Sequence, residues 1–277
     1  MKLGINTLLW TAAFNDTHLP LFPRIKAWGF DGVEVATFSF DHFPGRKIAQ
    51  AAGDAGLDVT LCSALTGSMS LVGDDATKAR DFLKQGIAMA AEMGTATFVG
   101  PFCAPVGQLL GRRRTLDEWK RAVDSLASIV PELESHNVTL ALEPLNRFET
   151  YFLNTLADGV ELCRQVGSPR VGLLYDTFHA NIEEKDPPAA FTSSAAHIAH
   201  VHTCENDRGI PGSGHVGWDD LFAAIRRAKY DNWLVIESFG FSIPEIAAAA
   251  CIWRDLAANA EDIASEGIKF LLHHTRA

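Results

Sequence analysis

Four ionisable side chains lie at the ends of four apolar runs in the second half of the chain. They are Glu143 in VTLALEPL, Asp176 in VGLLYDTFH, His202 in HVHTCE and Glu237 in LVIESF. Three oxygen donors and one imidazole form a hard, mixed ligand set, which suits Mn²⁺, Mg²⁺ or Co²⁺ better than a structural zinc site built on thiolates. The four residues therefore predict a site for one divalent ion. Mn²⁺ is the expected cofactor, with Co²⁺ or Mg²⁺ as alternatives.

The spacing of these residues indicates which elements position them. They are 33, 26 and 35 residues apart, which is about one strand and one helix in each interval. Short apolar runs alternate with stretches of helical periodicity along the whole chain. Strands are predicted at residues 3–10, 32–38, 58–65, 96–102, 138–145, 171–177, 199–204 and 234–239. Helices are predicted at 19–28, 46–55, 76–93, 116–135, 156–166, 188–198, 218–228 and 243–253, with an additional C-terminal helix at 259–273.

Eight strand–helix units in 277 residues predict an α/β fold, a (β/α)₈ TIM barrel with an additional C-terminal helix. An open, doubly wound sheet is the alternative, but no GxGxxG follows the first predicted strand, and eight units allow a barrel to close without exposed edges. No Pro/Ser-rich linker divides the chain, so residues 1–277 are expected to form a single domain. Left-handed caps are predicted after four helices, at Gly29, Gly56, Gly94 and Gly167.

In such a barrel the carboxyl ends of the strands form the face that holds active sites. The four polar residues end four consecutive predicted strands, so each can point into the mouth while its apolar neighbours face the helices. Three carboxylates in an apolar funnel repel one another, and a bound cation removes that conflict. The C-terminal helix is expected either to close the bottom of the barrel or to join protomers.

Charge and cysteine content exclude several classes of function. Lys and Arg number 24 and Asp and Glu 34, a net charge of −10, which disfavours nucleic acid, a barrel nuclease and anionic membranes. The five cysteines include no CxxC pair, which is typical of reduced thiols in a cytoplasmic protein. The first apolar run is too short for a signal peptide, and no 18-residue uncharged apolar stretch occurs, so no membrane partner is expected.

Four segments resemble the ketose 3-epimerases, the group of D-tagatose and D-allulose (psicose) 3-epimerases within the xylose-isomerase-like barrels. They are EPLNRFE at 143–149, DTFHANIEE at 176–184, HVHTCENDR at 200–208 and VIESF at 235–239. The resemblance implies that Glu143, Asp176, His202 and Glu237 bind Mn²⁺ or Co²⁺, and that Glu143 and Glu237 exchange a proton with the substrate. It also implies that Glu149, His179 and Arg208 hold the ketose end of a free sugar, and that the chain assembles as a homodimer or homotetramer.

The ligand types account for this chemistry. A proton next to a carbonyl is too weakly acidic for an unaided carboxylate, whereas chelation of the sugar oxygens stabilises the developing charge by several kcal/mol. If Glu143 and Glu237 lie on opposite faces of carbon 3, one removes a proton and the other delivers one, which inverts the stereocentre. The same site serves an aldose–ketose isomerase or a 3-keto-sugar lyase. A non-catalytic sugar-binding barrel is the alternative from another class.

Several further positions carry expectations. His179 is expected in a loop, and His200 is expected to be a core histidine with satisfied hydrogen bonds rather than a fifth ligand. Residues 112–114 are read as a solvated basic loop, and residues 209–214 as a plain loop rather than a phosphate nest. Asn6, Pro105 and the segment SFGF at 238–241 depart from the family pattern at positions expected to contact the distal end of the substrate. The sequence therefore predicts a reaction type but not the preferred sugar.

Overall fold

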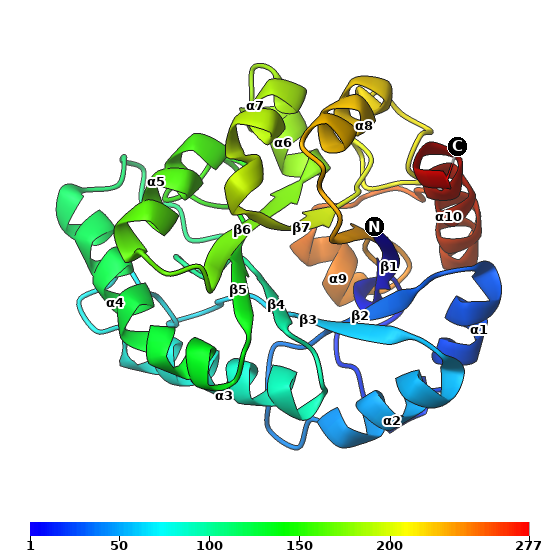
Figure 1. Cartoon of the computed structure of the whole chain (residues 1–277), viewed down its shortest axis with the longest axis horizontal. Helices are drawn as coiled ribbons and strands as arrows, with labels where there is room; N and C mark the ends of the chain where they lie inside the picture. The colour runs from blue at the N-terminus through cyan, green and yellow to red at the C-terminus, as the bar shows by residue number, and fades with distance from the viewer. Residues whose placement is uncertain (277) are drawn as a thin grey trace.

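The computed structural model describes residues 1–276 and contains eight parallel strands closed into a barrel in sequence order, with helices around it (Figure 1). The strands are β1 (Lys2–Asn6), β2 (Gly32–Ala36), β3 (Asp58–Cys62), β4 (Thr97–Gly100), β5 (Thr139–Leu142), β6 (Val171–Asp176), β7 (Ile198–His202) and β8 (Trp233–Ile236). Because β1 pairs with both β2 and β8, the described part of the chain leaves no free sheet edge. The predicted TIM barrel is confirmed, and the open sheet is wrong.

The outer ring contains eight helices, at least one after each strand. They are α1 (Leu21–Trp28), α2 (Gly45–Ala55), α3 (Thr77–Glu92), α4 (Leu116–Ser135), α5 (Leu156–Val166), α7 (Pro187–Ser194), α8 (Trp218–Arg227) and α10 (Ala260–Arg276). Two shorter helices are α6 (Thr177–Glu183) and α9 (Pro244–Ala249), and 3₁₀ turns occur at Thr7–Leu9, Asp16–His18 and Ala195–His197.

The predicted C-terminal helix is present as α10, the dark red helix beside α1 in Figure 1. It packs against α1, β1 and β8. On its other side, the ring of Phe270 lies 5.3 Å from that of Trp218 in α8. The helix therefore completes the outer ring between α8 and α1, rather than closing the bottom of the barrel.

Local sequence signals explain where several helices begin and end. Thr115 and Glu118 form a capping box at the start of α4, and the Thr155 hydroxyl caps α5. The predicted left-handed glycines are confirmed. Gly29 ends α1, Gly56 ends α2 and Gly167 ends α5, and Gly94 follows shortly after α3. These caps terminate the helices and turn the chain back toward the next strand.

The predicted strands extend too far at their carboxyl ends. The run 3–10 contributes only Lys2–Asn6 to the sheet, and the run 58–65 only Asp58–Cys62. The residues that follow stay apolar and buried, as at Leu8 and Leu65, because they pack at the mouth of the barrel. Hydrophobicity at these positions reflects burial in loops, which sequence periodicity does not distinguish from a strand. The helix predicted at 243–253 is likewise only Pro244–Ala249.

Side chains alternate between the helix layer and the barrel interior. On β2, Val33 and Val35 belong to the large core beneath the helices, whereas Ala36 packs in a small interior cluster with Cys62 and Ala141. These interior residues are small, which leaves space above them at the mouth. No helix among residues 1–276 is long and apolar enough to cross a membrane.

Gly100, the last residue of β4, offers a test of this close packing. Its φ is +145°, and a Cβ there would lie 1.8 Å from the Ser63 carbonyl oxygen. We expect Gly100→Ala to lower the free energy of unfolding by about 3 kcal/mol, measured by urea unfolding. Gly94→Ala is the control, because Gly94 also has a positive φ but open space around it; a loss of about 1 kcal/mol is expected there. Equal losses in the two variants would contradict the clash at Gly100.

Candidate active site

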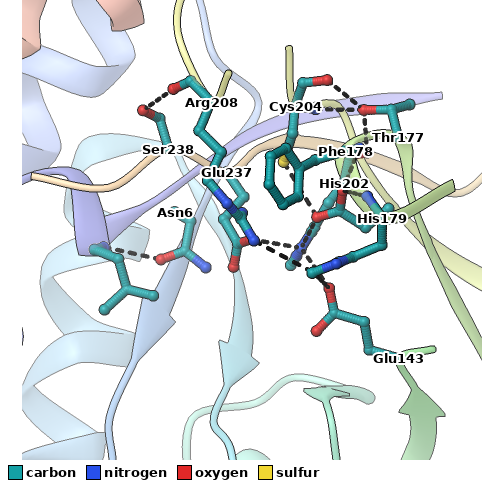
Figure 2. A network of polar contacts seen from close by, with 12 residues as sticks. Asn6, Glu143, Thr177, Phe178, His179, His202, Cys204, Arg208, Glu237 and Ser238 are labelled. Carbon is teal, nitrogen blue, oxygen red and sulfur yellow. Dashed lines mark hydrogen bonds and ion pairs between the residues drawn. The ribbon is translucent and has the colours of Figure 1, made fainter. Parts of the chain in front are cut away.

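The structure brings the four predicted ligands together at the mouth of the barrel. Figure 2 labels three of them, Glu143, His202 and Glu237. Asp176 and His202 end β6 and β7 and are register partners, while Glu143 and Glu237 directly follow β5 and β8. One donor atom from each residue lies within 4.8 Å of the other three. All four side chains are buried. The cluster can hold a metal ion.

Distances within the cluster fit a divalent cation. His202 Nδ1 lies 3.6 Å from Asp176 Oδ2, 3.5 Å from Glu237 Oε2 and 4.0 Å from Glu143 Oε1. Ligands bound at about 2.1 Å stand about 3 Å apart when adjacent and about 4 Å apart when opposite. Within residues 1–276, Glu143 Oε1 and His202 Nδ1 are buried without a hydrogen-bond partner. Orphaned polar atoms are rare in protein interiors, so these two atoms indicate a missing positive partner.

Electrostatics support the same interpretation. Burial, together with the carboxylates of Glu237 and Asp176, raises the pKa of Glu143 well above its usual range. Burial also acts to raise the pKa of Asp176, but His179, His202 and Arg208 outweigh it, and the net effect is a lowered pKa. The fold therefore keeps Asp176 ionised, while without a cation Glu143 resists ionisation.

The four side chains differ in how firmly the protein holds them. Asp176 caps α6 and accepts hydrogen bonds from the backbone N–H of Phe178 at 2.6 Å and from Cys204 Sγ at 3.2 Å. His202 Nε2 lies 2.7 Å from Glu34 Oε1. Glu237 Oε2 accepts a hydrogen bond from Arg208 Nη1 at 3.0 Å. Glu143 is the least restrained of the four.

His179 lies in α6, so the prediction of a loop is wrong. Asp176 caps the start of this helix. The helix has only seven residues, which is too short for its apolar periodicity to be recognised in the sequence. His179 Nδ1 accepts a hydrogen bond from the backbone N–H of Asn146 at 3.0 Å, so a neutral ring carries its proton on Nε2. Burial lowers the pKa of His179, which favours the neutral ring. Its Nε2 lies 3.5 Å from Glu143 Oε1.

Arg208 is buried and lies between two aromatic rings. Its guanidinium carbon is 4.1 Å from the ring centre of Phe178 and 4.3 Å from that of Phe239. Its Nη2 lies 3.3 Å from His179 Nε2 (Figure 2). Arg208 therefore reaches residues of the site rather than only the acids of its own loop.

Glu149 lies at the edge of the site. Its Oε1 is 4.0 Å from Arg208 Nη2 and accepts a hydrogen bond from Asn146 Nδ2 at 2.8 Å. It does not cap the following helix, because Thr155 does so.

A cavity of about 550 Å³ lies above the cluster, large enough for a monosaccharide. Its polar wall contains all three predicted sugar-binding residues and both predicted proton-exchanging residues: Glu143, Glu149, His179, Arg208 and Glu237. The rest of the lining is mainly apolar and includes Leu8, Phe38 and Ile246. Phe239 of the segment 238–241 lines this cavity, whereas Asn6, Pro105 and Ser238 are not among its lining residues. Contact of these positions with the distal end of the substrate stays a prediction.

Other sequence expectations have mixed outcomes. His200 is buried and outside the four-residue cluster, as expected of a core histidine, but neither of its ring nitrogens makes an aligned hydrogen bond to a described residue. The basic run 112–114 is not simply solvated, because Arg112 binds Glu118 through two hydrogen bonds of 2.9 Å. Residues 209–214 form a loop, as predicted.

Sequence reasoning missed one acid of the site. Glu34 on β2 is fully buried directly beside His202. The available signal was a lone carboxylate in the middle of the apolar strand GVEVA. An acid inside a strand that is apolar on both sides must have partners in the interior of the barrel.

The fold and the site define a TIM barrel with a carboxylate–histidine cluster at the ends of four consecutive strands. The family model of the xylose isomerase-like TIM barrel matches residues 22–274. A "Probable ketose 3-epimerase" of Synechocystis sp. is 37% identical over 274 residues, which cover 98% of this chain and 96% of that protein. The L-ribulose 3-epimerase of Mesorhizobium japonicum is 30% identical, with 98% and 93% covered.

A solved structure of L-ribulose 3-epimerase superposes with a TM-score of 0.94 at 29% identity, covering 99% of this chain and 94% of that one. The chain therefore belongs to the ketose 3-epimerases of the xylose isomerase-like TIM barrel family. The resemblance inferred from the four sequence segments is confirmed.

The raised pKa values in the cluster predict how pH affects the metal-free protein. Burial acts to lower the pKa of His202, but the carboxylates of Glu237 and Glu34 outweigh it, and the net effect is a raised pKa. The pKa of Glu143 is raised as well. In the unfolded chain both groups have mostly lost their protons by pH 7. The folded state then binds more protons, so its free energy of unfolding should fall from pH 7 to pH 8. The lowered pKa values of His179 and His200 leave both rings neutral in this window.

Urea unfolding at the two pH values, after removal of metal with a chelator, measures this fall. Glu143→Gln should show a smaller fall than the wild type, because one of the two groups is gone. Saturating Mn²⁺ should also reduce this fall in the free energy of unfolding between pH 7 and pH 8. A wild-type stability that is constant or rises over the window would contradict the electrostatic account.

Proposed function

We propose that the protein is a metal-dependent ketose 3-epimerase that inverts carbon 3 of a free ketohexose or ketopentose. The observation that carries the proposal is the four-residue cluster at the floor of a sugar-sized cavity, with Glu143 and Glu237 both in the cluster and in the cavity wall. The names of the relatives point to the same reaction.

Glu143, Asp176, His202 and Glu237 would hold Mn²⁺, with Co²⁺ or Mg²⁺ as alternatives, because the three carboxylates and one imidazole are hard donors. When bound, the ion supplies Lewis-acid stabilisation of negative charge on the sugar oxygens. The unpartnered atoms Glu143 Oε1 and His202 Nδ1 support this assignment.

Glu143 and Glu237 carry the proton transfer. They follow β5 and β8, with β6 and β7 between them, so their carboxylates approach a sugar in the cavity from different sides. One carboxylate takes the proton from carbon 3, and an enediolate forms. The other, protonated, delivers its proton to the opposite face of the same carbon. Exchanging the two roles gives the reverse reaction.

His179 and Arg208 orient the ketose end of the sugar. The Nε2–H of neutral His179 and the guanidinium of Arg208 are both donors, and they lie only 3.3 Å apart. They do not satisfy each other, so both are available to one acceptor oxygen of the substrate. Glu149 adds an acceptor for a hydroxyl group at the same end of the cavity.

The remaining expectations stay predictions. They are the assembly as a homodimer or homotetramer, the cytoplasmic location, and a small sugar as the partner in place of nucleic acid or membrane. The aldose–ketose isomerase, the 3-keto-sugar lyase and the non-catalytic barrel are the alternative functions that the experiments below separate.

Turnover in deuterated water tests the reaction type. We expect D-fructose, D-tagatose or L-ribulose to give the 3-epimer with deuterium on carbon 3, because the proton delivered comes from a carboxyl group that exchanges with solvent. The position of the label is read by NMR. Label on carbon 1 or 2 with a moved carbonyl indicates an isomerase, and loss of a substituent from a 3-keto sugar indicates a lyase. No reaction with any of these sugars favours the non-catalytic barrel.

Replacing either proton carrier tests the mechanism. Glu143→Gln and Glu237→Gln should each reduce kcat by about 10²–10⁴-fold, because an amide does not accept the proton from carbon 3. Glu134→Gln, an exposed change on α4, is the matched control and should retain wild-type kcat. Near-normal turnover by both site variants would refute the two-carboxylate mechanism.

A further inference from the structure

A second polar group lies in the barrel interior next to the four-residue cluster, centred on Glu34. This side chain is 0% exposed. Its register partners on the neighbouring strands are Asn6 on β1 and Thr60 on β3. Asn6 Nδ2 donates to Glu34 Oε1 at 2.9 Å, and Thr60 Oγ1 donates to Oε2 at 2.9 Å. Two adjacent strands therefore fix the carboxylate from one side.

Histidines from β7 approach the same carboxylate from across the barrel. His202 Nε2 lies 2.7 Å from Glu34 Oε1. His200 Nε2 lies 2.9 Å from Oε2, although its ring is turned out of line for a good hydrogen bond. An ionised carboxylate has only acceptors, so each group that faces Glu34 must present a hydrogen.

Glu34 forms a hydrogen-bonded network with Asn6, Thr60 and His202, and its close approach to the two histidines is not a second metal site. A metal bound at about 2.1 Å by both a nitrogen and an oxygen holds these atoms about 3 Å apart or more. The observed contacts of 2.7 and 2.9 Å are hydrogen-bond distances. Each oxygen of Glu34 also accepts a bond from Asn6 or Thr60, which occupies the remaining lone pairs.

We infer that Glu34 is a positioning residue that keeps the proton of His202 on Nε2 and so presents the Nδ1 lone pair to the metal. The inference rests on the metal site of the proposed function. The two nitrogens of His202 face in opposite directions: Nε2 meets Glu34, and Nδ1 meets the carboxylates of Asp176, Glu143 and Glu237. With a fixed hydrogen on one nitrogen, the neutral ring has one tautomer, and only Nδ1 can act as a ligand.

The same contact also fixes the plane of the imidazole. The carboxylate is anchored by β1 and β3, on the side of the barrel opposite β6 and β7, so the ring of His202 is tied to both halves of the sheet. Negative charge on Glu34 also makes the lone pair of His202 Nδ1 more basic and so a stronger metal ligand.

Metal binding by three variants tests the role of Glu34. Glu34→Met keeps the size of the side chain but removes the acceptor, and it should weaken Mn²⁺ binding 10–100-fold, measured by calorimetric titration of the metal-free protein. Glu34→Gln keeps an oxygen acceptor without the charge and should give an intermediate loss. Thr95→Val is the matched control: it removes a buried hydroxyl that accepts a hydrogen bond from the backbone N–H of Thr97 and makes none with Glu34, and it should bind Mn²⁺ within about twofold of wild type.

The tautomer itself is measured in the wild type, independently of whether any variant folds. Histidine ¹⁵N NMR of the Mg²⁺-loaded protein should show His202 with its proton on Nε2. A proton on Nδ1 refutes the inference, as does unchanged Mn²⁺ affinity in Glu34→Met, or an equal loss in Thr95→Val. Wild-type protein that binds no Mn²⁺ refutes the metal site of the proposed function, and the inference with it. Wild-type binding that Glu34→Met leaves unchanged refutes only the role of Glu34.

Discussion

Repulsion between buried carboxylates is the constraint on which the site depends. Closing the barrel places the ends of β5 to β8 side by side, and with them Glu143, Asp176 and Glu237. Like charges in a desolvated interior interact far more strongly than in water. The chain supplies the buried guanidinium of Arg208 near the cluster, and the raised pKa of His202 adds at most a second positive charge, so three ionised acids are not balanced. The raised pKa of Glu143 and the raised pKa of His202 are two consequences of the same deficit of positive charge.

The cluster divides into groups that are held and a group that is free to react. Asp176 is fixed by the start of α6 and by Cys204, and His202 is fixed by Glu34. These two side chains line no part of the sugar-sized cavity, whereas Glu143 and Glu237 do. A ligand that only holds an ion benefits from rigid partners. A carboxylate that must gain and lose a proton needs an oxygen without a fixed donor, and Glu143 Oε1 has none among residues 1–276.

The sequence predicts the parts of this arrangement that depend on local periodicity. Strand ends locate the four ligands because the position of a residue along a barrel strand determines its height in the barrel and whether its side chain points inward or outward. Contacts made across the barrel leave no such pattern. Glu34 contacts His202, 168 residues away, and neither GVEVA nor HVHTCE indicates that these two residues pair. Residues after the strands are apolar because they are buried at the mouth of the barrel, so hydrophobicity predicts strands that extend beyond their observed ends. The short helix α6 depends on a single cap, Asp176, and a lone Asp at the end of a strand does not distinguish a helix cap from a metal ligand.

Arg208 shows how the fold fixes a charge before substrate arrives. Its backbone φ is +63°, a left-handed conformation that costs a residue with a side chain about 1 kcal/mol. The Ser238 hydroxyl donates to its carbonyl oxygen at 2.6 Å, and Phe178 and Phe239 cover both faces of the guanidinium. These contacts come from two separate segments, around Phe178 and at Ser238 and Phe239, and converge on Arg208. They leave the edge of the guanidinium facing Glu237 and His179, so its donors are already oriented toward the cavity. Donors that need no reorganisation stabilise developing charge more effectively than mobile ones, which explains why a strained backbone is retained at this position.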